Sequence, residues 1–196
     1  MNMLKSNLLL VALASSWSVA VPVRAQGPVV YAPPLPATKL EMFETNTGRI
    51  LIKTTALIGS IPVNAASVSV TAKAVTDLSS GHKEYGIVIG LSLDQTPESP
   101  DRSTVDYDEV DSLLNAIDVL AKLDWSVTTW TSFDATYYTA DRFKLAVFSV
   151  KGSGTIVYSV RSSRMNKSWV LTNSQLLELR GLVEQAKRKI DEVRPK

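Results

Sequence analysis

The sequence contains no cysteine and only one histidine. Without cysteine the chain forms no disulfide, offers no thiolate ligand and carries no cysteine nucleophile, so packing alone must stabilise the fold. His82 lies in the polar stretch SSGHK, and one histidine without cysteine does not build a typical zinc site. No G-x-S-x-G motif is present, which removes the usual signature of one large class of serine hydrolases. We therefore expect neither a metal nor another cofactor.

A glycine-rich phosphate loop is also missing. The stretch KGSGT (151–155) lies between two predicted strands rather than before a helix, and we interpret it as a hairpin turn. Carboxylate-based hydrolysis needs only two acids that the fold brings together, so an enzyme of that kind stays open. No motif marks such a pair, and a non-enzymatic protein is the favoured interpretation.

Long apolar runs are confined to the start of the chain, which has the pattern of an export signal. Lys5 precedes the apolar run LLLVALA (8–14), and VRA (23–25) offers small residues where a signal peptidase cleaves. The run is shorter than the ~20 apolar residues of a membrane span. We expect a signal peptide at 1–25, with cleavage after Ala20 as the alternative, and an exported protein, periplasmic or secreted, with no stable membrane span once the signal is removed.

The charge excess of the chain is small and partly belongs to this signal. The whole sequence has 21 basic and 19 acidic residues, and the signal holds Lys5 and Arg24 but no acid. The remainder therefore carries 19 residues of each sign. A general electrostatic attraction to polyanions is not supported.

After the signal, residues 26–38 are rich in proline and are expected to form an extended tether. The folded domain is expected at 39–193. Alternating apolar and polar residues, clearest in ASVSVTAKAV (66–75), predict strands there. The predicted strands are 39–45, 48–59, 66–75, 84–94, 127–139, 142–151, 154–162 and 167–172, and residues 95–104 are predicted to be a loop.

Apolar residues spaced by three and four predict two amphipathic helices, one from Tyr107 to Ala121 and one from Leu176 to Val193. The fold class is therefore α+β, mainly antiparallel sheet with two amphipathic helices. Two ββββα repeats, 39–123 and 127–193, are one interpretation. One continuous antiparallel sheet with both helices on one face is the alternative.

The acidic stretch DYDEVD (106–111) suggests a cation site at first sight. It lacks the glycine and the distal glutamate of a calcium loop, so a helix start is favoured. Asp106 and Glu109 have the spacing of a capping box, and Thr172 and Gln175 repeat that spacing without acids at the second helix. Three glycines also bear on packing. Gly86 and Gly90 indicate a bent strand or a close neighbour across the sheet, and the mid-helix Gly181 would fit a close approach of its helix to the sheet.

Aromatic and basic residues gather in the second half of the chain. Aromatic rings beside cations on a sheet can stack on bases or sugars and hold phosphates. The simpler interpretation is that strand propensity places these rings in the core and along the edges. The candidate ligand-binding residues are Trp125, Trp130, Tyr137, Tyr138, Arg142, Lys144, Arg161 and Arg164.

The element order of 39–193 resembles that of the Whirly and PUR-type single-stranded nucleic-acid-binding proteins. A strand runs into a helix in KSWVLTNSQLLELRGLVEQAKRKI (167–190), and a looser counterpart combines YGIVIGLSLD with DYDEVDSLLNAIDVL. The resemblance implies curved sheets that carry the ligand, with paired helices behind them. It is a match of element order only, and no specific binding motif carries over.

These observations predict an exported, non-enzymatic binding or interaction module, with a protein or polymer of the exported compartment as its partner. Two alternatives stay open. One is a binder of single-stranded nucleic acid or another polyanion through the aromatic and basic sheet face. The other is a hydrolase with a carboxylate pair assembled by the fold.

Overall fold

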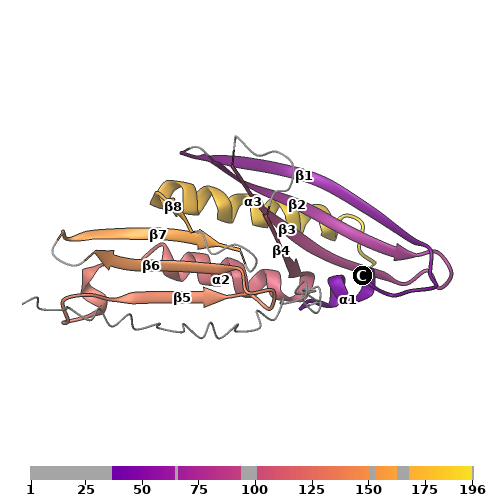
Figure 1. Cartoon of the computed structure of the whole chain (residues 1–196), viewed down its shortest axis with the longest axis horizontal. Helices are drawn as coiled ribbons and strands as arrows, with labels where there is room; N and C mark the ends of the chain where they lie inside the picture. The colour runs from indigo at the N-terminus through magenta and orange to yellow at the C-terminus, as the bar shows by residue number, and fades with distance from the viewer. Residues whose placement is uncertain (1–36, 65, 94–100, 151–152, 163–167, 196) are drawn as a thin grey trace, which may run out of the picture. The chain divides into compact units, whose positions relative to one another are not determined.

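A computed structural model describes residues 37–64, 66–93, 101–150, 153–162 and 168–195. It contains two four-stranded antiparallel sheets and, within the described residues, three α-helices, which confirms the α+β class (Figure 1). The predicted signal peptide, the tether up to residue 36 and Arg164 lie outside the described residues.

The first sheet has the strand order β1-β2-β3-β4, so each strand pairs with its neighbour in sequence. Its strands are β1 (Leu51–Val63), β2 (Ala66–Asp77), β3 (Lys83–Leu93) and β4 (Asp101–Asp106). Burial alternates along most of β2, as the sequence pattern predicts for a strand with one face on the core.

The second sheet repeats this layout with the order β5-β6-β7-β8. Its strands are β5 (Asp134–Tyr138), β6 (Lys144–Val150), β7 (Thr155–Arg161) and β8 (Trp169–Leu171). Val150 pairs with Thr155, and Gly154 has a φ of 66°, a left-handed conformation that glycine adopts at no steric cost. The antiparallel pairing of β6 and β7 predicted on either side of KGSGT is therefore confirmed, while Lys151 and Gly152 lie outside the described residues.

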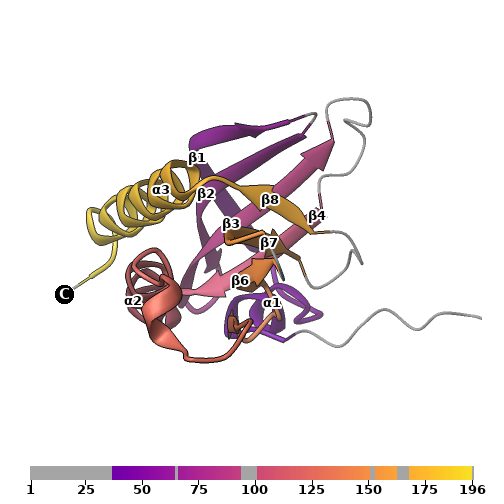
Figure 2. The same cartoon turned by 90° about the vertical axis from the view of Figure 1, so that its left-hand side faces the viewer.

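Two long helices follow the two sheets along the chain, and each packs on the sheet of the other half. Helix α2 (Val110–Leu120) follows the first sheet but contacts β6, whereas α3 (Asn173–Asp191) follows the second sheet but packs along β1, β2 and β3 (Figures 1 and 2). The helices also contact each other. Arg180 of α3 donates through Nε to Asp118 Oδ1 at 2.6 Å and through Nη2 to Oδ2 at 3.0 Å.

One hydrophobic core joins both sheets and both long helices. Fully buried side chains from every layer contribute to it, including Ile89, Ile117, Phe143, Leu145 and Leu179. The predicted capping box at the start of α3 is confirmed. Thr172 Oγ1 accepts from the Gln175 amide at 3.1 Å, and the Thr172 amide donates to Gln175 Oε1 at 2.8 Å.

The strand predicted at 39–45 is wrong, because these residues form the short helix α1 (Lys39–Glu44). Thr38, expected in the tether, is buried and caps this helix by accepting from the Glu41 amide. Leu40 and Phe43 are spaced by one helical turn, and they bury against Val75 in a small separate core.

The capping box predicted at Asp106 and Glu109 is also wrong. A short 3₁₀ turn, η1 (Tyr107–Glu109), precedes α2, and the Asp106 side chain caps a different helix. Its Oδ2 accepts from the Lys39 amide at 2.8 Å and its Oδ1 accepts from the Leu40 amide at 3.0 Å. Asp106 therefore stabilises the start of α1, 66 and 67 positions away in sequence.

Two further predicted bounds are wrong. The predicted loop at 95–104 contains most of β4, which pairs with β3 in the register Gly86 to Asp106. The predicted strand at 127–139 shortens to β5, because Val127 belongs to the 3₁₀ turn η2 (Trp125–Val127) and residues 128–133 form neither helix nor strand. Asp124 caps this turn by accepting from the Ser126 amide at 2.7 Å.

Two of the glycines noted in the sequence, Gly86 and Gly181, have opposite surroundings. A Cβ atom on Gly86 would lie 2.6 Å from the Val105 carbonyl oxygen, so the predicted close neighbour is confirmed. A Cβ atom on Gly181 would meet nothing within 4 Å, so the close helix–sheet approach predicted there is wrong.

Candidate binding surface

Three of the predicted binding residues lie side by side on the outer face of the second sheet. Tyr138 of β5 pairs with Lys144 of β6, which in turn pairs with Arg161 of β7. The Lys144 Nζ atom lies 5.7 Å from the centre of the Tyr138 ring, within the range of a cation–π contact. Tyr138 is 51% exposed, so the row faces solvent.

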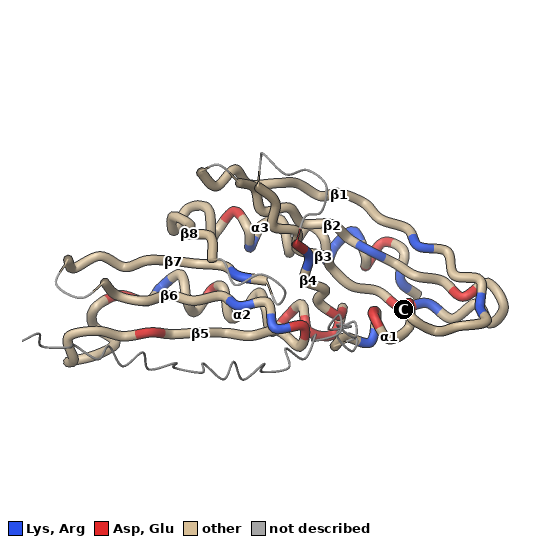
Figure 3. The backbone as a smooth tube through the Cα atoms, viewed as in Figure 1, with Lys and Arg blue, Asp and Glu red and all other residues tan. Residues whose placement is uncertain are grey.

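Arg142 extends this basic group into the turn between β5 and β6. The residue is exposed and has a φ of 58°, an uncommon conformation for a side chain of this size. Its amide donates to the Thr139 carbonyl at 2.8 Å, which closes the turn. Basic positions therefore gather at one end of β6 and β7, as Figure 3 shows.

The other end of the same face is apolar. Phe148 of β6 pairs with Val157 of β7. Phe148 lies two residues after Ala146, on the same face of the strand. Phe148 and Val157 are half-buried and belong to neither core cluster of the described residues, while Val150 and Val170 are exposed. The solvated face of an antiparallel sheet is commonly polar, so this apolar end indicates an interaction surface.

Two other predicted aromatics, Trp125 and Tyr137, do not join this face. The Trp125 indole donates to the Gly154 carbonyl at 3.0 Å and meets the Phe133 ring edge-on at 5.9 Å, so it supports the hairpin. Tyr137 packs against the main core, where burial and the nearby Glu109 raise the pKa of its phenol. Trp130 is 81% exposed in the segment between α2 and β5.

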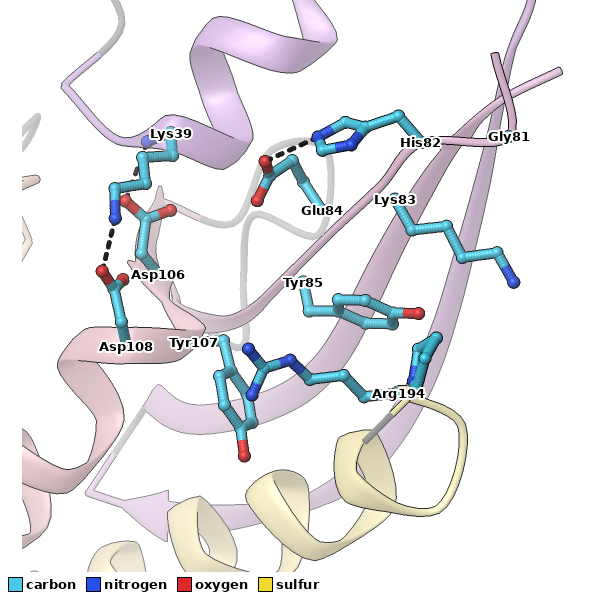
Figure 4. A pocket seen from close by; sticks show the side chains of 11 residues that line it. Lys39, Gly81, His82, Lys83, Glu84, Tyr85, Asp106, Tyr107, Asp108 and Arg194 are labelled. Atoms are coloured by element: carbon cyan, nitrogen blue, oxygen red, sulfur yellow. Dashed lines mark hydrogen bonds and ion pairs between the residues drawn. The ribbon is translucent and has the colours of Figure 1, made fainter. Parts of the chain in front are cut away.

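A pocket that the sequence did not reveal lies beside α1. It has a volume of about 700 Å³ and is formed by the starts of α1 and β3, the end of β4, η1 and the residues after α3 (Figure 4). We call it the Tyr107 pocket. Its lining residues are Lys39, Gly81, His82, Lys83, Glu84, Tyr85, Asp106, Tyr107, Asp108, Arg194 and Pro195.

The acids of this pocket are already paired. The Lys39 ammonium contacts the Asp108 carboxylate, which raises the pKa of Lys39 and lowers that of Asp108. His82 Nε2 lies 2.9 Å from Glu84 Oε1, and its ring meets Phe43 edge-on at 5.2 Å.

Tyr107 organises the opposite wall of the pocket. The Arg194 guanidinium carbon lies 4.2 Å from the centre of the Tyr107 ring, and Figure 4 shows the two side chains together. The Tyr107 hydroxyl donates to the Asp191 carboxylate, which lowers the pKa of Asp191. Both contacts hold the ring in place.

A catalytic carboxylate pair finds little support in this geometry. Burial raises the pKa of Glu109, whose Oε1 accepts from the Ala140 amide at 2.8 Å, but Glu109 does not line the pocket. Asp108 does line it, yet its pKa is lowered. Within the described residues, no three His, Cys, Asp or Glu side chains are grouped so that they could hold a metal ion.

The comparisons with known proteins add no assignment. No protein-family model, no curated protein and no solved structure matches the chain. The resemblance to the Whirly and PUR-type proteins therefore stays a prediction. Among the described helices, none combines the length and the apolar character of a membrane span.

Proposed function

We propose that the protein is an exported, non-enzymatic binding module whose binding surface is the outer face of the second sheet. The observation that carries this proposal is the row of Tyr138, Lys144 and Arg161 beside the apolar pair Phe148 and Val157 on one solvated face. A folded protein gains nothing from leaving such apolar groups in water, whereas a partner that covers them gains their burial.

The partner that fits is a protein or polymer of the exported compartment with an anionic group next to an apolar one. The anionic group would meet Arg161 and Lys144, and the apolar group would cover Phe148 and Val157. Charge at the rim of such a contact mainly sets the association rate and orientation, while the buried apolar centre supplies most of the affinity.

A photo-crosslinking amino acid in place of Tyr138, in cells that produce the protein, tests this surface. We expect a discrete adduct from position 138 and none from Leu177, an exposed apolar residue of α3 that serves as the matched control. The same adduct from both positions, or none from position 138, would contradict the proposal.

A single-stranded nucleic acid or another polyanion is the second candidate partner. The contact between Lys144 and the Tyr138 ring favours it, because a ring held by a cation can stack on a base while the neighbouring Arg161 holds a phosphate. The equal numbers of acids and bases outside the predicted signal count against it.

Fluorescence anisotropy with a labelled oligothymidine separates the two candidates. A nucleic-acid binder should lose affinity steeply between about 50 mM and about 200 mM salt. The double variant Lys144→Ala, Arg161→Ala should then bind more weakly than Arg188→Gln, a control on the exposed side of α3. Absence of binding at low salt eliminates the polyanion candidate and leaves the first one standing.

Export has its own test. Mass spectrometry of the protein from the medium or periplasm should give a chain that starts at Gln26, or at Val21 for the alternative cleavage site. A chain that retains Met1 in the cytoplasm would contradict export and leave the binding surface unaffected.

A further inference from the structure

The Tyr107 pocket lies apart from the proposed binding surface, and its hydrogen-bonding groups are unevenly used. Its carboxylates have donors. Asp106 accepts from two backbone amides of α1, Asp108 from the Lys39 ammonium, and Glu84 lies 2.9 Å from His82 Nε2. A ligand that enters the pocket therefore finds few acceptors that still need a donor.

Two cations of the pocket, Lys83 and Arg194, are in the opposite condition. In the described part of the chain, no carboxylate lies within ion-pair distance of Lys83 or Arg194, although both line the pocket. The charge of Arg194 still acts at longer range, because it helps to lower the pKa of Asp108 and of Asp191. No described residue accepts a hydrogen bond from the Arg194 guanidinium, so a ligand can bind these N–H groups.

The aromatic residues complete the recognition surface. The Tyr107 hydroxyl donates to Asp191, and the Tyr107 ring contacts Arg194 and, at 5.4 Å, the Lys187 ammonium, so Tyr107 serves to hold Arg194. The Tyr85 hydroxyl donates to the Val193 carbonyl at 3.5 Å, so Tyr85 offers mainly its ring. Stacking on Tyr107 restricts the Arg194 guanidinium to a plane, and a guanidinium fixed in this way presents paired N–H groups to a carboxylate or phosphate.

We infer that the Tyr107 pocket binds a small molecule with a planar or apolar body and a terminal carboxylate or phosphate group. Arg194, held by the Tyr107 ring, binds the anionic group, and the Tyr85 ring contacts the body. The volume of about 700 Å³ is within the range of pockets that hold small-molecule ligands. This inference goes beyond the proposed function, which concerns a different surface.

Calorimetric titration of the mature protein tests the inference with benzoate, phenyl phosphate and the neutral benzyl alcohol as probes. We expect saturable binding of at least one anionic probe and much weaker binding of the alcohol. Arg194→Gln should weaken the anionic probe about tenfold, as the loss of one charge-assisted contact predicts. The affinity of Arg194→Lys for the anionic probe should lie between those of the parent protein and Arg194→Gln, because lysine keeps the charge but lacks the planar guanidinium.

Two controls protect the interpretation. Arg188→Gln removes an exposed cation of α3 outside the pocket and should leave binding unchanged. Urea unfolding should show that Arg194→Gln is as stable as the parent protein. Preference for benzoate or for phenyl phosphate identifies the anionic group within the proposed class. Equal affinity for benzyl alcohol, equal weakening by Arg188→Gln, or no saturable binding of either anion would overturn the inference.

Discussion

Replacement of Asp106 by alanine should detach α1 from the first sheet. The Asp106 carboxylate is buried, and it accepts from the Lys39 amide at 2.8 Å and from the Leu40 amide at 3.0 Å. Helix α1 spans only six residues, which is too short to persist without tertiary support. Loss of both acceptors leaves Thr38 as the remaining side-chain cap.

The magnitude follows from the bonds that are lost. One N-cap replaced by alanine costs about 0.5–2 kcal/mol, and each hydrogen bond to a charged group is worth about 1.5–3 kcal/mol. Water can donate and accept some of the lost hydrogen bonds once α1 loosens. We therefore expect Asp106→Ala to lower the free energy of unfolding by about 2–4 kcal/mol. Asp106→Asn keeps one acceptor oxygen and should lose about half as much.

Urea unfolding monitored by circular dichroism measures this loss, and hydrogen exchange of the Leu40 amide shows whether α1 opens locally. Asp108→Ala is the matched control, because the Asp108 side chain is 62% exposed and its ion pair with the Lys39 ammonium lies at the surface. That variant should unfold like the parent protein. An Asp106→Ala protein within about 0.5 kcal/mol of the parent, with unchanged exchange at Leu40, would refute the capping role.

The other predictions concern two glycines and two carboxyl groups, and urea unfolding measures each. Gly181→Ala should stabilise the protein by about 1 kcal/mol because the site is helical and open, whereas Gly86→Ala should cost about 1–3 kcal/mol because its Cβ would strike the Val105 carbonyl; equal effects would contradict the packing at Gly86. Hydrogen bonds from the Ser79 hydroxyl and amide lower the pKa of Asp77 well below its ordinary value of 3.8. The stabilisation by Asp77 is then complete above that value and is lost as the pH falls below it, so the deficit of Asp77→Asn should shrink below about pH 4, and a constant deficit would exclude this linkage. Burial raises the pKa of Glu109 above its ordinary value of 4.5, so its charge destabilises the fold at higher pH. Glu109→Gln should therefore stabilise the protein at about pH 7 and lose that advantage below about pH 4.5, and no gain at neutral pH would argue against the burial penalty.

Periodicity predicted those elements whose apolar face is continuous. The alternation in β2 and the three-and-four spacing in α3 are visible in the sequence because each of these elements buries one face against the core. Strand β4 was not predicted, because its buried residues include the polar Asp101, Ser103 and Thr104, a composition that is typical of a loop. Its pairing with β3, rather than its own pattern, makes it a strand.

Helix α1 was not predicted for a related reason. The carboxylate that caps it belongs to Asp106, which lies 67 positions away in sequence from Lys39, whose amide donates to it. The same distance explains the error at DYDEVD. Its acids do mark a helix start by spacing, but tertiary contacts assign Asp106 to α1, while Glu109 accepts from the Ala140 amide. Local rules cannot choose between partners that only the fold brings together.

The sequence shows that aromatic and basic residues gather in the second half of the chain, but not which of them share one face of the sheet. Strand parity separates Tyr138 from Tyr137, and the register of β5, β6 and β7 brings Tyr138, Lys144 and Arg161 together. That register depends on the turn at 139–143, which the sequence does not specify. The Tyr107 pocket could not be predicted from the sequence, because its residues come from separate segments between Lys39 and Pro195.

The exchange of helices between the two halves has a consequence for fragments of the chain. A piece that ends near Leu123 would contain the first sheet without α3, its cover, and the complementary piece would contain the second sheet without α2. Each piece would expose to water the apolar side chains that the missing helix covers. Neither fragment should therefore fold by itself, and the two should complement each other only when mixed, with native circular dichroism returning as they associate. The halves follow one another in sequence, but each supplies a helix that packs on the sheet of the other, and one core joins them.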